Sequence, residues 1–123
     1  MQRVLIVDDD QLVADTLTLI FGKCGFDAKA AYSADQAMEY AREFRPHLLL
    51  CDISMPGRDG VELVKEISKE QPDCRILVLT GFHSNLHRVS EQSSKLPRPL
   101  GMMTKPCAPD DLLREANALL ASA

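Results

Sequence analysis

The sequence lacks three features that would each have indicated a class of protein. Its four cysteines, Cys24, Cys51, Cys74 and Cys107, form no C-x-x-C pair, which argues against a zinc site and against a thioredoxin-type motif. No apolar run approaches the roughly 20 residues that a membrane-spanning helix needs. The net charge is −4, whereas a nucleic-acid surface normally shows a basic patch or stripe. We therefore expect neither a membrane protein nor a nucleic-acid binder.

A targeting segment is also missing from the first residues. The chain passes directly from Met1 into an apolar run, with no small-residue cleavage site. We therefore expect a cytoplasmic protein, in which the cysteines stay reduced. Hydrophobic residues make up 46% of the chain and charged residues 26%, the balance of an ordinary globular protein. The length of 123 residues suits one compact domain, spanning residues 1–123.

Apolar runs alternate with helix-like stretches along the chain. Three runs are continuous, as in strands buried on both faces of a parallel sheet, and two weaker runs complete the set: residues 4–7, 48–51, 76–79, 28–31 and 101–104. Apolar residues at helical spacing lie between them, in residues 11–24, 33–45, 61–70 and from 109 onward. This pattern predicts an α/β domain whose five-stranded parallel sheet carries helices on both faces.

The stretch from 83 to 99 fits this pattern least well. It is polar, has prolines at 97 and 99, and offers only the sparse apolar stripe Leu86, Val89 and Leu96. A helix there would have to end before Pro97. We therefore expect an atypical fourth helix.

Chemically useful side chains follow the predicted strands. Asp8, Asp9 and Asp10 come after the first strand, and the third, fourth and fifth strands lead to Asp52, Thr80 and Lys105. In an open parallel sheet the carboxyl ends of the strands share one edge, where ligands bind. Crowded carboxylates repel one another, and Mg²⁺ suits a site of carboxylates, a carbonyl and waters. A metal, a lysine and a hydroxyl around a carboxylate are the parts that phosphoryl transfer needs.

Four segments together resemble the receiver domain of two-component response regulators. They are residues 7–10 (VDDD), 52–60 (DISMPGRDG), 79–81 (LTG) and 104–106 (TKP), and the D-x-x-M-P-G-x-D-G run is the most specific. The resemblance covers essentially the whole chain, with the segments in the family's order and spacing. It implies a flavodoxin-like, doubly wound (βα)5 fold and a stand-alone receiver like those of chemotaxis, because the chain ends about one helix after Lys105.

The resemblance also implies a role for each site residue. Asp52 would accept the phosphoryl group from a phosphohistidine of a sensor histidine kinase or a histidine phosphotransfer protein. Thr80 would hydrogen-bond the phosphoryl group, and Lys105 would pair with its oxygens. The implied ligands of Mg²⁺ are Asp9 and Asp52 directly, Asp8 through water, and the backbone carbonyl of Ser54. Such a protein is a phosphorylation-controlled signalling module that switches partner binding or relays the phosphoryl group, not an enzyme with a separate substrate.

Two other interpretations of the acidic run remain open at this stage. Aspartates between a strand and a helix are commonly N-caps, and we expect Asp10 to be one. A small phosphatase like the haloacid dehalogenases would use Asp8 and Asp10 in a D-x-D-x-[TV] motif, but Leu12 occupies its last position.

The sequence departs from the resembled family at the switch. Many receivers have an aromatic residue three positions before the lysine, where this chain has Met102. Together with the unusual stretch from 83 to 99, this predicts an output route that differs from the family's.

Cys51 adjoins Asp52, but alternation along a strand turns it to the opposite face, and we expect it to pack in the core.

Overall fold

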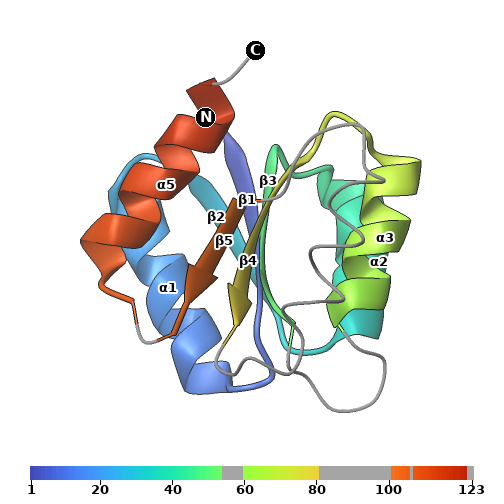
Figure 1. Cartoon of the computed structure of the whole chain (residues 1–123), viewed down its shortest axis with the longest axis horizontal. Coiled ribbons are helices and arrows are strands. Elements are labelled where there is room, and N and C mark those ends of the chain that lie inside the picture. The colour runs from blue at the N-terminus through green and yellow to red at the C-terminus, as the bar shows by residue number, and fades with distance from the viewer. Residues whose placement is uncertain (54–59, 81–100, 106, 122–123) are drawn as a thin grey trace.

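The computed structural model describes residues 1–53, 60–80, 101–105 and 107–121. Its centre is one sheet of five parallel strands in the order β2-β1-β3-β4-β5 (Figure 1). The strands are β1 (Arg3–Val7), β2 (Asp27–Ala31), β3 (Leu48–Asp52), β4 (Arg75–Thr80) and β5 (Gly101–Thr104). Each begins within a residue of its expected position. The predicted parallel α/β sheet is confirmed, and its strand order is that of flavodoxin-like folds.

Helices cover both faces of this sheet, as predicted. The described residues contain α1 (Gln11–Lys23), α2 (Ala34–Phe44), α3 (Gly60–Glu70) and α5 (Pro109–Ala121). Helices α1 and α5 lie on one face and α2 and α3 on the other (Figure 1). None of the helices described is both long and apolar enough to cross a membrane. The atypical helix expected between 83 and 99 lies outside the described residues.

Successive residues of the central strands bury their side chains on opposite faces. In β1, Val4 and Ile6 pack on the side of α1 and α5, whereas Leu5 and Val7 pack on the side of α2 and α3. The same alternation in β3 puts Cys51 into the second group, with no measurable exposure. Burial on both faces explains why these strands are continuous apolar runs. The expected packing role of Cys51 is confirmed.

Helices α1 and α2 both begin at a residue whose side chain caps the helix. Asp10 accepts hydrogen bonds from the backbone N–H groups of Leu12 and Val13, and Ser33 accepts one from the N–H of Gln36. The side chain of Gln36 reaches back to the N–H of Tyr32 instead of that of Ser33. These bonds form a capping box whose return bond is displaced by one residue.

A reciprocal pair of hydrogen bonds joins the starts of β1 and β3, at the edge of the sheet opposite the acidic run. The N–H of Arg3 donates to Nδ1 of His47 at 2.9 Å, and the N–H of His47 donates to the carbonyl of Arg3 at 2.8 Å. Nδ1 must therefore be unprotonated. Burial, with the positive charges of Arg3 and the N-terminal amine, lowers the pKa of His47.

We expect this histidine to make the fold less stable in mild acid. Because its pKa is lower in the folded than in the unfolded chain, the unfolded chain binds more protons below the ordinary histidine pKa of about 6.5. The stabilising contribution of neutral His47 is complete above that pH and is lost as the pH falls toward the lowered pKa of the folded protein. Thermal melting from about pH 7.5 to about pH 5 measures it. His47→Asn keeps an acceptor that does not titrate, so its melting temperature should fall less, and an equal fall in both proteins would refute the idea.

Candidate functional site

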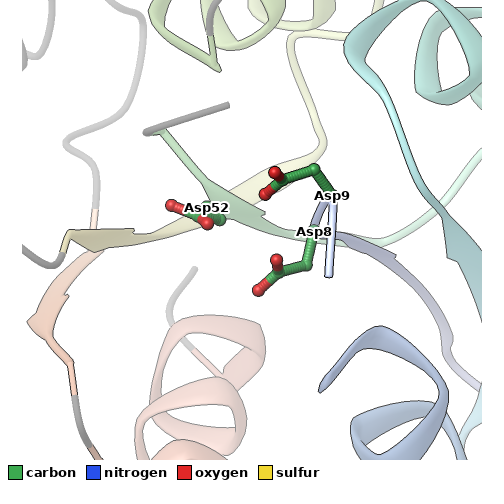
Figure 2. Close-up of side chains that lie close together, drawn as sticks. All are labelled: Asp8, Asp9 and Asp52. Carbon is green, nitrogen blue, oxygen red and sulfur yellow. The ribbon is translucent and has the colours of Figure 1, made fainter. Parts of the chain in front are cut away.

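The site lies where the strand order reverses. Strand β1 pairs with β2 on one side and with β3 on the other, and Val7 lies beside Cys51 in that ladder. Asp8 directly follows β1 and Asp52 ends β3, so their side chains emerge next to one another at the carboxyl edge (Figure 2). This is the switch point at which open parallel sheets bind ligands.

Three of the predicted site residues form one acidic group. Asp8, Asp9 and Asp52 each offer a carboxylate oxygen, and these oxygens lie within 4.8 Å of one another (Figure 2). Asp8 and Asp52 are buried, with 2% and 7% of their surface exposed, whereas Asp9 is exposed. Two unit charges about 4 Å apart repel by about 4 kcal/mol at an effective dielectric of about 20. Hard oxygen ligands in this number fit the magnesium ion that the sequence predicted.

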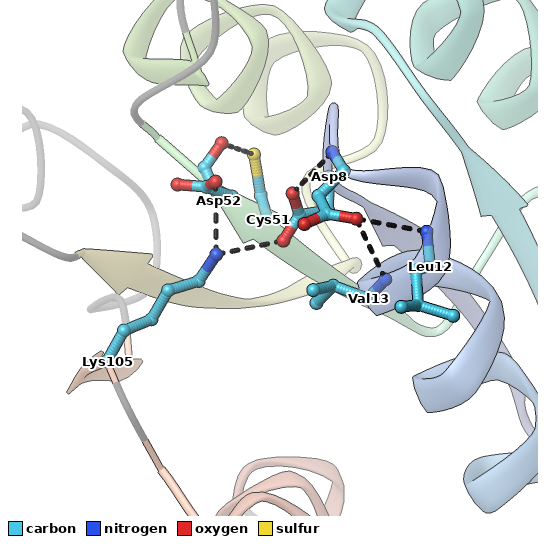
Figure 3. A network of polar contacts seen from close by, with 7 residues as sticks. Asp8, Leu12, Val13, Cys51, Asp52 and Lys105 are labelled. Atoms are coloured by element: carbon cyan, nitrogen blue, oxygen red, sulfur yellow. Dashed lines mark hydrogen bonds and ion pairs between the residues drawn. The ribbon is translucent and has the colours of Figure 1, made fainter.

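Lys105, which follows the edge strand β5, partly neutralises the group. Its ammonium nitrogen lies 2.9 Å from Oδ2 of Asp8 and 3.1 Å from Oδ2 of Asp52 (Figure 3). Burial alone would lower the pKa of this amine, but the hydrogen bond that it donates to Asp8 and the charge of Asp52 outweigh burial, and the pKa is raised. The lysine is therefore a firmly charged cation placed between two carboxylates.

The backbone holds both Lys105 and Asp8 in place. The N–H of Lys105 donates to the carbonyl of Thr80 at 2.8 Å, which continues the β4–β5 ladder to the site. Oδ1 of Asp8 accepts the N–H of Asp10 at 2.9 Å, while Oδ2 accepts the ammonium of Lys105. Both carboxylate oxygens of Asp8 thus accept hydrogen bonds. Asp8 is the inner, buried acid of the site, and Asp9 is the outer, exposed one.

The remaining predicted residues divide between those that the structure describes and those it does not. Thr80 ends β4 and is 1% exposed, and Leu79 beside it is the ladder partner of Asp52. The threonine therefore reaches the same edge one position beyond Asp52. Ser54 lies outside the described residues. Met102 is on β5 and is 39% exposed.

One residue near the site, Gly60, was not predicted to have a role there. Gly60 begins α3, and a Cβ atom there would lie 2.5 Å from Cα of Ile53 and 2.9 Å from the carbonyl oxygen of Asp52. Only a residue without a side chain permits this approach of helix and strand. The D-x-x-M-P-G-x-D-G spacing was the sole signal of it in the sequence.

Comparison with known proteins identifies the family. A family model described as the response regulator receiver domain matches residues 4–117. The chain belongs to this family. Receiver domains of two-component systems accept phosphoryl groups and act in signalling, so the family does not favour the phosphatase interpretation.

Solved structures of other receivers have the same fold. A CheY-like receiver protein from Methanospirillum hungatei is 28% identical with a TM-score of 0.87, and the match covers 98% of this chain and 94% of that one. The chemotaxis response regulator CheY4 of Vibrio cholerae is 24% identical over 97% and 98% of the two chains, with a TM-score of 0.83. NtrX from Brucella abortus is 27% identical with a TM-score of 0.84. That match covers 98% of the present chain but only 27% of the NtrX chain.

Proposed function

We propose that Asp52 accepts a phosphoryl group from the phosphohistidine of a sensor histidine kinase or histidine phosphotransfer protein. Residues 1–123 act as one receiver, which switches partner binding or relays the phosphoryl group. The observation that carries the proposal is the ammonium of Lys105 bridging Asp8 and Asp52, beside the carboxylate of Asp9.

The residues present support each part of the transfer. An oxygen of Asp52 attacks phosphorus, the P–N bond of the phosphohistidine breaks, and the imidazole leaves with the bonding electrons. Lys105 already contacts Asp52, so its ammonium can pair with the oxygens of the transferred phosphoryl group. Thr80, at the end of the neighbouring strand, would donate its hydroxyl proton to one of those oxygens. Fixed positive charge at the transferring group is the main catalytic contribution in phosphoryl transfer.

Asp8, Asp9 and Asp52, with the carbonyl of Ser54, would hold Mg²⁺. The ion supplies positive charge that offsets the carboxylates and the incoming phosphoryl oxygens. Because both oxygens of Asp8 already accept hydrogen bonds, the exposed Asp9 is the better direct ligand, and Asp8 suits contact through water.

The Asp9→Ala variant tests this assignment. Removing one carboxylate from the crowded group should weaken Mg²⁺ binding and raise the melting temperature of the metal-free protein, because a like-charge repulsion is lost. Melting curves with and without Mg²⁺ measure both effects. A variant that melts lower without metal, yet gains as much from Mg²⁺ as the parent, would contradict the assignment.

The proposal itself is tested by labelling with a small phosphodonor. Incubation with Mg²⁺ and a labelled donor should add one acid-stable, base-labile acyl phosphate, and peptide mapping should place it on Asp52. Label on Asp8 would instead support the phosphatase interpretation.

A further inference from the structure

A partly open cavity lies on the face of the sheet covered by α1 and α5. Its volume is about 250 Å³. The described residues that line it come from both helices, from β4 and from the segment between β5 and α5: Val13, Leu17, Leu79, Lys105, Cys107 and Leu112. Because the cavity is partly open, a small molecule can enter it from solvent.

Water is a poor occupant of this cavity. Only two of its described lining residues carry a polar group, Lys105 and Cys107. The ammonium of Lys105 is already bound by Asp8 and Asp52. Burial raises the pKa of the Cys107 thiol, so the sulfur stays uncharged and is a weak hydrogen-bonding group. The described side chains therefore offer few hydrogen-bond partners to water that enters the cavity.

The geometry points to a binding site for a small uncharged apolar molecule, aromatic or branched aliphatic, between α1 and α5. An apolar cavity of about 150 Å³ is large enough for benzene, and this one is larger. Displacing poorly held water by apolar atoms favours binding. Anions are disfavoured, because most of the described lining is apolar and the ammonium of Lys105 is already paired with Asp8 and Asp52.

A molecule in this site would contact the same lysine that serves the acidic group. The cavity lies on the side of α1 and α5 and is lined in part by Lys105, whose ammonium donates hydrogen bonds to Asp8 and Asp52 (Figure 3). The bound molecule would therefore contact the side chain of Lys105. The inference goes beyond the proposed function, since the cavity exists whether or not Asp52 accepts a phosphoryl group.

Titration of the full chain with toluene, followed by amide and methyl NMR, tests the proposal. Saturable shifts should be confined to the neighbourhood of Leu17, Leu79 and Leu112. Benzoate has a similar ring with a negative charge and should bind at least tenfold more weakly, about the effect of 1.4 kcal/mol. The same toluene shifts should appear in Asp52→Asn protein, which separates this result from any failure of the phosphoacceptor proposal.

Two filling variants and a matched control complete the experiment. Val13→Phe and Cys107→Phe add a ring from different sides of the cavity, and each should abolish the toluene shifts while the remaining spectrum stays folded. Leu19→Phe adds the same ring at a position of α1 that is 66% exposed and should leave binding unchanged. Shifts that do not saturate, that survive in whichever filling variant folds, or that are equally strong with benzoate would overturn the proposal.

Discussion

Replacing Asp52 by asparagine is expected to abolish phosphoryl labelling by a small donor. The amide nitrogen and oxygen of asparagine do not form the acyl phosphate that a carboxylate forms. Asp52 contacts Lys105 and also pairs with Leu79 near the end of β4. The expected signal is that of unlabelled protein. Denaturing gel analysis after incubation with labelled donor and Mg²⁺ gives the measurement.

Asp8→Asn is the matched control for this loss. The substituted amide keeps an oxygen acceptor for the N–H of Asp10 but gives up the charge that pairs with Lys105. We expect slower labelling that still maps to Asp52. If Asp52→Asn protein retains label and the label maps to Asp8, the receiver mechanism is wrong for this chain.

Replacing Gly60 by alanine is expected to reduce both stability and the rate of labelling. The added methyl group would lie 2.5 Å from Cα of Ile53 and 2.9 Å from the carbonyl oxygen of Asp52, and backbone atoms cannot turn aside as a flexible side chain can. Overpacking of this kind costs about 1–3 kcal/mol. The strain falls on the backbone of the acceptor itself, so labelling should slow even at temperatures where the variant is folded.

Gly22→Ala controls for the intrinsic effect of alanine in a helix. Gly22 lies in α1, and a Cβ atom there would meet nothing within 4 Å. Alanine should stabilise that helix by up to about 1 kcal/mol and leave labelling unchanged. Urea unfolding compares the two variants. A Gly60→Ala protein as stable and as readily labelled as Gly22→Ala would show that α3 can move away from β3 without cost.

The sequence was most informative where local rules decide the structure. Buried parallel strands need apolar side chains on both faces, so runs such as residues 48–51 could be placed directly. Caps at Asp10 and Ser33 follow from side chains that bond the nearby backbone. The return bond of Gln36 could not be foreseen at the level of one residue, because it depends on the exact entry angle of the chain.

Contacts between distant parts of the chain were beyond such rules. The order of the strands predicted that Lys105 and Asp8 share an edge, but only the packed structure shows the lysine bound to two carboxylates at once. Nothing near His47 in the sequence indicates its hydrogen bond with Arg3. The contact of Gly60 with Ile53 depends on the distance between a helix and a strand, which the spacing of residues does not determine.

Because β5 lies at the edge of the sheet, its rate of local opening should depend on the charge at the site. Within the described chain β5 hydrogen-bonds to β4 alone, and it ends immediately before Lys105. Edge elements open locally more often than central ones. Each opening would withdraw the cation from Asp8 and Asp52, at an electrostatic cost set by the net negative charge left behind. Amide exchange in β5 should therefore speed up when a bound cation neutralises the carboxylates and slow down when negative charge is added to them.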